Sequence, residues 1–198
     1  MYWKILTFKK TTNPINLNYF EKELIFMKTN KIVMTSLFLA IGLILHQITP
    51  GIFLGIKPDF LLVFMILSII LTKDFKITLI TGIVAGALCA LTTSFPGGQL
   101  PNIIDKIVTS IIVYAIYKSS NSNASSSIKL TGIYFLGTLI SGSIFLSSAL
   151  ILFGLPAPFL ILFVSVVLPT SLLNSFLGFS LHKLIISNPV IKRNFINY

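Results

Sequence analysis

The sequence predicts an all-α protein of the polytopic membrane class, with six transmembrane helices and both termini in the cytoplasm. Of its 198 residues, 55% are hydrophobic and only 10% are charged, which leaves too little polar surface for an ordinary soluble domain. The apolar residues form long runs separated by short polar segments, whereas the strands of a membrane barrel alternate apolar and polar residues over ~10 positions. Lysines are concentrated at alternate ends of these runs, as in helical membrane proteins of defined orientation.

The six predicted helices follow the apolar runs and the residues that end them. They cover about residues 32–49, 60–72, 77–94, 102–117, 130–153 and 159–186. Pro50 and Gly51 end the first helix. The second has 13 residues, fewer than the ~20 that span a bilayer, so we expect it to be tilted little or to be partly re-entrant.

Small residues and prolines predict how the later helices pack. Gly82 and Gly86 stand four positions apart, a spacing that indicates a central and closely packed third helix. Pro169 is expected to interrupt the sixth helix. Residues 118–129 are rich in Ser and Asn and are expected to be a flexible connection between four front helices and two rear ones.

The two ends of the chain are expected to differ from the membrane domain. Residues 1–26 show no sustained apolar period, and Met27 followed by Lys28 is typical of a membrane-protein start. We therefore expect residues 1–26 to be either a poorly structured cytoplasmic extension or a mis-assigned start, residues 27–190 to form the six-helix domain, and residues 191–198 to be a cytoplasmic tail.

The distribution of positive charge predicts the orientation. Lys57 and Lys106 are on one side, and the other side is expected to hold Lys28, Lys31, Lys73, Lys76, Lys118, Lys129, Lys183, Lys192 and Arg193. The basic side is predicted to be cytoplasmic, which places the loop before Asp59 and the loop from Pro96 to Pro101 outside the cell. Because the net charge of +10 is spread over helix ends, we expect contacts with anionic lipid in the bilayer and no nucleic-acid partner.

Motifs for catalysis and cofactor binding are missing from the sequence. A single cysteine, Cys89, excludes an intramolecular disulfide and a cysteine-based metal site. His46 and His182 are expected near opposite membrane faces, and HExxH, GxSxG and GxxxxGK[ST] do not occur. We therefore expect no enzyme activity and neither a metal nor a nucleotide cofactor in this chain.

Charged side chains near the predicted outer face suggest a binding site. Asn102, Asp105 and Lys106 lie at i, i+3 and i+4, on one face of a helix. Together with a Lys57–Asp59 pair they could hold a zwitterion, whose two charges each need a partner once desolvated. Alternatively, both pairs serve structure, and His46 is an interfacial histidine. The candidate substrate-binding residues are Lys57, Asp59, Gln99, Asn102, Asp105, Lys106, His46 and Asn174.

From Met27 to about Ile186 the chain resembles the tryptophan-specific substrate-binding (S) component of energy-coupling factor (ECF) transporters, a bacterial family of six-helix proteins. The resemblance rests on Ala40-Ile41-Gly42, Leu45-His46, Pro50-Gly51-Ile52-Phe53, Gly55-Ile56-Lys57-Pro58-Asp59, the block from Leu91 to Lys106, Gly137-Thr138-Leu139-Ile140-Ser141-Gly142 and Val167-Leu168-Pro169. The central block is its most specific part.

The resemblance implies a multi-pass protein of the bacterial cell membrane that binds extracellular tryptophan. It also implies docking on a shared module, made of a transmembrane coupling protein and two ATPase subunits that use ATP. The family's first helix meets the coupling protein through an AxxxA pattern, which reads Ser36 and Ala40 here. The loop that contains Ile52 to Ile56 would close the pocket. Tryptophan as the substrate comes from the resemblance alone.

Two other functions remain open from the residues themselves. The chain could be a stand-alone proton- or sodium-coupled carrier of a small solute, with Asp105 as the titrating group. It could also be an assembly subunit that carries no solute.

Overall fold

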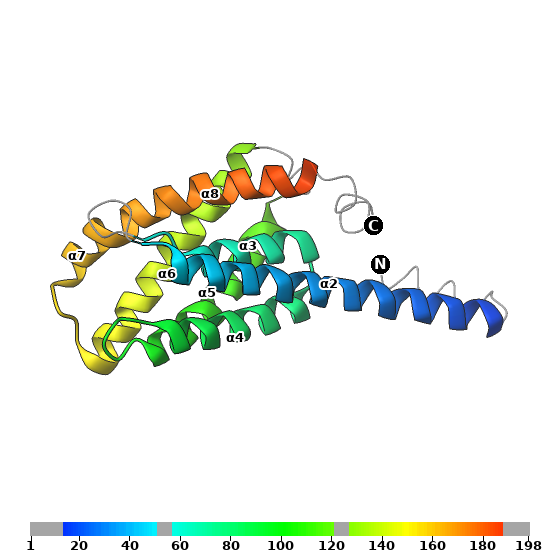
Figure 1. Cartoon of the computed structure of the whole chain (residues 1–198), viewed down its shortest axis with the longest axis horizontal. Coiled ribbons are helices and arrows are strands. Elements are labelled where there is room, and N and C mark those ends of the chain that lie inside the picture. Colours follow the sequence, from blue (N-terminus) through cyan, green and yellow to red (C-terminus); the bar gives the residue numbers. More distant parts are fainter. Residues whose placement is uncertain (1–13, 51–56, 121–126, 188–198) are drawn as a thin grey trace.

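The computed structural model describes residues 14–50, 57–120 and 127–187, and all regular secondary structure in these residues is helical. The elements are α2 (Pro14–Ile48), α3 (Phe60–Thr72), α4 (Phe75–Thr92), α5 (Gln99–Ser119), α6 (Ser127–Phe153), α7 (Phe159–Leu162), the π-helical turn η1 (Phe163–Val167) and α8 (Leu168–Ser187) (Figure 1). Five helical stretches are long and apolar enough to cross a membrane, and α3 is a shorter apolar helix. The predicted all-α membrane fold is confirmed.

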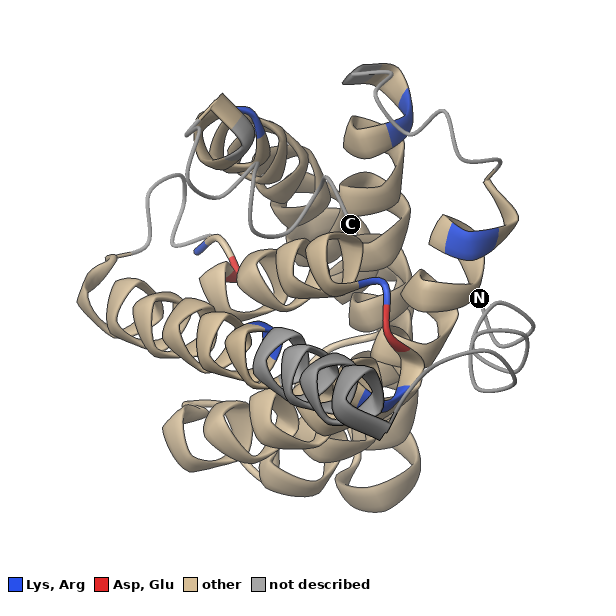
Figure 2. Ribbon diagram, turned by 90° about the vertical axis from the view of Figure 1, so that its right-hand side faces the viewer, with Lys and Arg blue, Asp and Glu red and all other residues tan. Residues whose placement is uncertain are grey.

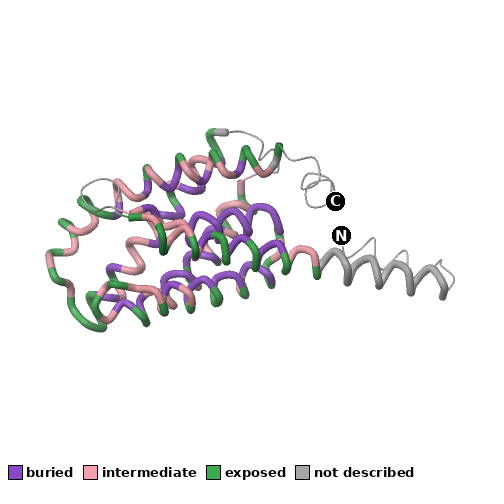
Figure 3. The backbone as a smooth tube through the Cα atoms, viewed as in Figure 1, coloured by how far each residue is buried: buried purple, intermediate pink, exposed green. Residues whose placement is uncertain are grey.

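The helix at the centre of the bundle is α3. Every residue from Leu61 to Thr72 is buried, and the tube in Figure 3 is purple along nearly its whole length. The prediction that the third helix is central is wrong, because α4 leaves Ile80 and Ile83 exposed on its outer side. Its close packing is confirmed: a Cβ added at Gly86 would lie 3.0 Å from the Cα of Ile103 in α5.

The short length of α3 follows from its two caps. The Asp59 side chain accepts a hydrogen bond from the Leu62 backbone N–H at the N-terminus, and Lys73 ends the helix in a left-handed conformation with φ of 52°. Thirteen residues make a helix of about 20 Å, shorter than the ~30 Å hydrocarbon core of a bilayer. Because α3 is short, Asp59 at its N-terminus lies within hydrogen-bond distance of Lys106, which is about two turns into α5.

The first helix begins earlier than expected. It was predicted from about residue 32, but α2 starts at Pro14 and includes residues 14–26. Proline is favoured at the first position of a helix, where its missing N–H needs no partner. Residues 1–13 and 188–198, which include the expected tail, lie outside the described residues.

The interruption of the last helix is confirmed and takes the form of a π-helical turn. The Leu168 N–H donates to the Phe163 carbonyl, five residues earlier. Pro169 follows directly and has no N–H to donate, so the regular pattern cannot continue through it. Val166 and Val167 of this turn line the cavity described below.

The basic residues gather at one end of the bundle. Figure 2 looks at this end, where the ends of α3, α5 and α8 meet the starts of α4 and α6. The Lys31 ammonium there donates to the Thr72 carbonyl at 2.9 Å. That this end faces the cytoplasm stays a prediction. Of the connection expected at 118–129, residues 118–119 belong to the end of α5, Ser120 is its C-cap, and residues 127–129 belong to the start of α6.

Candidate functional site

A cavity of about 360 Å³ lies between α3, α5, α6 and the π-helical turn, toward the end of the bundle opposite the lysines. Its volume is within the ~300–1,000 Å³ typical of small-molecule sites. One part of the wall is apolar and contains Phe95 and Phe145, whose rings meet edge to face with centroids 5.3 Å apart. The other part is polar and contains Asp59, Asp105 and Lys106.

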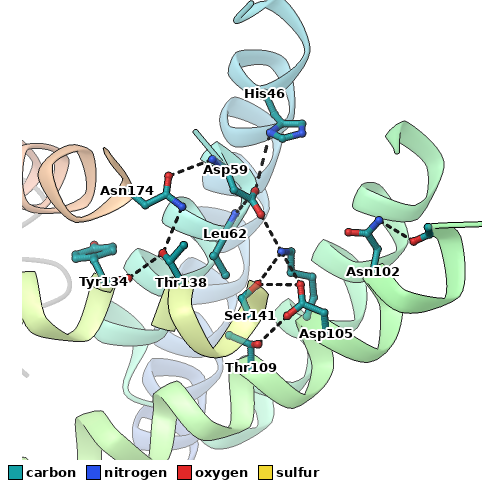
Figure 4. Close-up of polar contacts among 12 residues, drawn as sticks. His46, Asp59, Leu62, Asn102, Asp105, Thr109, Tyr134, Thr138, Ser141 and Asn174 are labelled. Atoms are coloured by element: carbon teal, nitrogen blue, oxygen red, sulfur yellow. Dashed lines mark hydrogen bonds and ion pairs between the residues drawn. The ribbon is translucent and has the colours of Figure 1, made fainter. Parts of the chain in front are cut away.

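Lys106 is the centre of the polar part, where its partners Asp59, Asp105 and Ser141 come together (Figure 4). Its ammonium lies 2.8 Å from Asp59 Oδ2, 2.8 Å from Asp105 Oδ2 and 3.2 Å from Ser141 Oγ. The side chain is only 3% exposed. A buried ammonium needs this many partners, because an unpaired charge away from water costs several kcal/mol, on the order of 3–5 when a buried pair is broken.

Asp105 is held inside the bundle by two further hydroxyl groups. Thr109, one turn later on α5, donates to Asp105 Oδ1 at 2.8 Å. Ser141 of α6 donates to Asp105 Oδ2 at 2.8 Å. With the bond from Lys106, the carboxylate accepts three hydrogen bonds and its side chain is 1% exposed. Asp105 is thus fixed from both α5 and α6.

Asp59 is placed by α8 and α6. Its backbone N–H donates to Asn174 Oδ1 at 3.1 Å, and Asn174 Nδ2 donates to Thr138 Oγ1 at 3.3 Å. Burial is the largest effect and would raise the pKa of the Asp59 carboxyl, but the Lys106 ammonium, His46 and the Leu62 N–H together lower it more, so the pKa lies below its usual value. Asp59 is therefore ionised near neutral pH. His46 Nδ1 is 3.9 Å from Asp59 Oδ1.

The ionic groups in this cluster do not balance. Two carboxylates contact one ammonium, so with both carboxylates ionised and His46 neutral the cluster carries one net negative charge. The predicted Lys57–Asp59 pair is wrong: among the described residues the ionic partners of Asp59 are Lys106 and His46. The carboxylate turns inward to cap α3, and the buried Pro58 separates it from Lys57.

The other predicted site residues fall into two groups. Asn102 lines the cavity, and its amide donates to the Gly98 carbonyl at 2.7 Å. Gln99 is exposed, Lys57 is half-buried, and neither is part of the cavity wall that the described residues form. Asn174 is also outside this wall but holds Asp59.

The two predicted docking positions and the loop expected to close the pocket lie elsewhere. Ser36 and Ala40 are exposed on the outer side of α2. The segment from Ile52 to Ile56 lies outside the described residues.

Apart from Asn174, sequence reasoning missed the contributions of the rear helices. Ser141, Thr138 and Phe145 of α6 and Thr170 of α8 all line the cavity. A signal was present, because hydroxyl groups in an apolar membrane helix commonly bond across to a neighbouring helix. The spacing of several serines in this run did not distinguish Ser141 from those that bond only to their own helix, such as Ser143.

The chain is similar to known proteins over most of its length. The sequence model of a family described as "Tryptophan transporter TrpP" matches residues 28–189. A "Probable tryptophan transport protein" of Clostridium acetobutylicum is 48% identical over 152 residues, which are 77% of this chain and 89% of that protein. Proteins of the same name from Clostridium perfringens and Bacillus subtilis are 45% and 43% identical, over 79% and 75% of this chain and 91% and 86% of theirs. No solved structure matches the chain.

Proposed function

Because the chain belongs to the tryptophan transporter family TrpP, we propose that it is a membrane-embedded subunit that captures extracellular tryptophan for ATP-driven uptake through a shared ECF module. It is a member of a family of transporters and not of enzymes, and its bacterial relatives and apolar helices make it a multi-pass membrane protein of bacteria. The proposal concerns the substrate, its site and the partners.

The observation that carries the proposal is the division of the cavity wall. Tryptophan has a large aromatic group at one end and charged groups at the other. The Phe95–Phe145 pair offers aromatic edges and faces to an indole ring, and aromatic pairs contribute about 0.5–1.5 kcal/mol beyond the area that they bury. The polar part of the wall offers Asp59, next to Lys106, to the charged end.

A binding experiment tests the site. Purified full-length protein in detergent should bind radiolabelled tryptophan, and Phe145→Ala should weaken this binding at least ~tenfold, because the indole loses an aromatic neighbour and buried area. Phe176→Ala is the matched control, since Phe176 is 70% exposed on α8 and is not part of the cavity wall. Equal affinities in the two variants would contradict the assignment of the cavity.

The coupling to an ECF module rests on the family resemblance and on the outer face of α2. This face exposes Val33, Leu37 and Ile44 beside Ser36 and Ala40, so a helix of a coupling protein could lie closely against the two small residues. In the proposed arrangement the two ATPase subunits hydrolyse ATP, and this chain supplies the bound tryptophan.

Docking and binding can be separated by a bulky substitution on α2. In cells that contain the module, Ala40→Phe should abolish tryptophan uptake while purified protein keeps its affinity for tryptophan. Ala115→Phe, at an exposed position on α5, is the matched control and should leave uptake unchanged. Uptake that continues in cells without the module and stops with an uncoupler would instead favour a stand-alone proton- or sodium-coupled carrier.

A further inference from the structure

We propose that the cavity recognises its guest through an ammonium group, which Asp59 accepts, and that Lys106 is an internal counter-ion instead of a receptor for the guest's carboxylate. The ligands of this site would then be aromatic primary ammonium compounds, of which a zwitterionic amino acid is one example. The inference rests on the proposed function and says which of the two charges of tryptophan the protein reads.

All three donors of the Lys106 ammonium have an acceptor among the described residues. An ammonium has three N–H donors, and the three acceptors around Lys106 are Asp59 Oδ2, Asp105 Oδ2 and Ser141 Oγ, at 2.8, 2.8 and 3.2 Å. The Ser141 hydroxyl gives its own hydrogen to Asp105, so its oxygen is free to accept from Lys106. A guest carboxylate could bind Lys106 only by displacing one of these acceptors.

The two carboxylates differ in how many of their acceptor positions are left for a guest. A carboxylate has about four acceptor positions. Asp105 uses three of them, for Lys106, Ser141 and Thr109, and its side chain is 1% exposed. Asp59 uses two toward the described residues, for Lys106 and the Leu62 N–H, and its side chain is 23% exposed. Asp59 is thus the carboxylate that can still accept hydrogen bonds from a guest.

The net charge of the three ionic side chains also favours a guest ammonium. With both carboxylates ionised, Asp59, Asp105 and Lys106 together carry one net negative charge. A guest ammonium at Asp59 would neutralise the cluster, whereas a guest carboxylate would add a second uncompensated negative charge in a place of low polarity. The described wall also offers neutral donors, such as the Asn102 amide and the Thr170 hydroxyl, which can bind a carboxylate but cannot neutralise it.

Three related ligands separate the two charges. Tryptamine keeps the ammonium of tryptophan and lacks the carboxylate, and indole-3-propionate keeps the carboxylate and lacks the ammonium. In competition against radiolabelled tryptophan on the purified full-length protein, tryptamine should bind within about tenfold of tryptophan. Indole-3-propionate should bind at least ~tenfold more weakly than tryptamine, since a hydrogen-bonded charge contributes roughly 1.5–3 kcal/mol, or about 10- to 150-fold.

The outcomes distinguish this inference from the proposed function. Tryptophan binding together with a preference for indole-3-propionate over tryptamine would overturn the ammonium assignment and leave the proposed function standing. Failure to bind any of the three compounds would overturn both.

Two variants test the role of Asp59 directly. Asp59→Asn removes the negative charge; its one carbonyl oxygen can still accept from the Leu62 N–H and cap α3, while Lys106 keeps its bonds to Asp105 and Ser141. Its affinity for tryptamine should fall at least ~tenfold, because hydrogen bonds to charged groups are about twice as strong as neutral ones. Unchanged affinity for tryptamine in this variant would overturn the inference.

A fixed cation at position 46 gives a second and independent measurement. His46 Nδ1 lies 3.9 Å from Asp59 Oδ1, so the ammonium of His46→Lys can compete with a guest ammonium for Asp59. This variant should bind tryptamine at least ~tenfold more weakly than His46→Gln, which changes the same side chain without adding a fixed charge. Equal affinities for tryptamine in the two variants would contradict the proposal even if Asp59→Asn failed to fold.

Discussion

Replacing Lys106 by methionine should destabilise the protein through the carboxylates that remain. The ammonium makes three hydrogen bonds, two of them to carboxylates at 2.8 Å. Methionine keeps most of the side-chain length, so little cavity is created, but Asp105 is left buried without its cation. Breaking a buried ion pair in this way costs about 3–5 kcal/mol. We expect a loss near the lower limit, about 3 kcal/mol, because Asp59 is partly exposed and its charge can be screened.

The matched comparison is a variant in which all three groups are neutral: Asp59→Asn, Asp105→Asn and Lys106→Met combined. It keeps the size of the side chains and removes the unpaired charges, so it should recover most of the lost stability. The free energy of unfolding can be measured by denaturant titration of the detergent-solubilised proteins. A single Lys106→Met variant within about 1 kcal/mol of the natural protein, or a triple variant no more stable than the single one, would refute the electrostatic reasoning.

Three further predictions concern the surroundings of the cluster. Asn174→Leu removes the bonds to the Asp59 N–H and the Thr138 hydroxyl, so the free energy of unfolding should fall by about 1–3 kcal/mol and tryptophan affinity should fall with it; unchanged affinity would show that Asn174 does not position Asp59. The Tyr134 hydroxyl is buried without a hydrogen-bond partner among the described residues, so Tyr134→Phe should be at least as stable as the natural protein, and a loss above about 1 kcal/mol would reveal a partner. The pKa of Asp59 lies below 3.8, so the charge-dependent part of binding is present at neutral pH and is lost only as the pH falls through that lowered value. In the His46→Gln background, tryptamine affinity should therefore be constant from about pH 8 to about pH 5, and a midpoint near pH 6 would contradict this assignment.

The positions of the helices could be predicted because caps and apolar runs are local features. The helix at 60–72 was predicted with the bounds that the structure has, since Asp59 stands before it and Lys73 and Asp74 stand after it. Its central place could not be predicted from the GxxxG rule, which identifies one close-packed face of a helix and does not show what covers the other faces. The length of α3 was a better indicator of its central place, because a helix of 13 residues is too short to face lipid across the whole bilayer.

The binding site was predictable in part for a similar reason. Asp105 and Lys106 are neighbours in sequence, and their hydrophobic surroundings alone require partners for their charges. The identity of those partners depends on tertiary structure: Lys106 bonds to Asp59, 47 positions away, and to Ser141, 35 positions away. Pairing by nearness in sequence favoured Lys57 for Asp59 and was wrong.

The π-helical turn before Pro169 has a consequence for the rest of the last helix. Such a turn holds one residue more than an α-helical turn within about the same rotation, so winding Phe163–Val167 as an ordinary α-helix, with no residue removed, would add about one residue of helix. Every later side chain would then be rotated by about 100° around the helix axis. Asn174 would no longer face the backbone of Asp59, and the anchor of the charged cluster would be lost although no residue of the cluster had been changed.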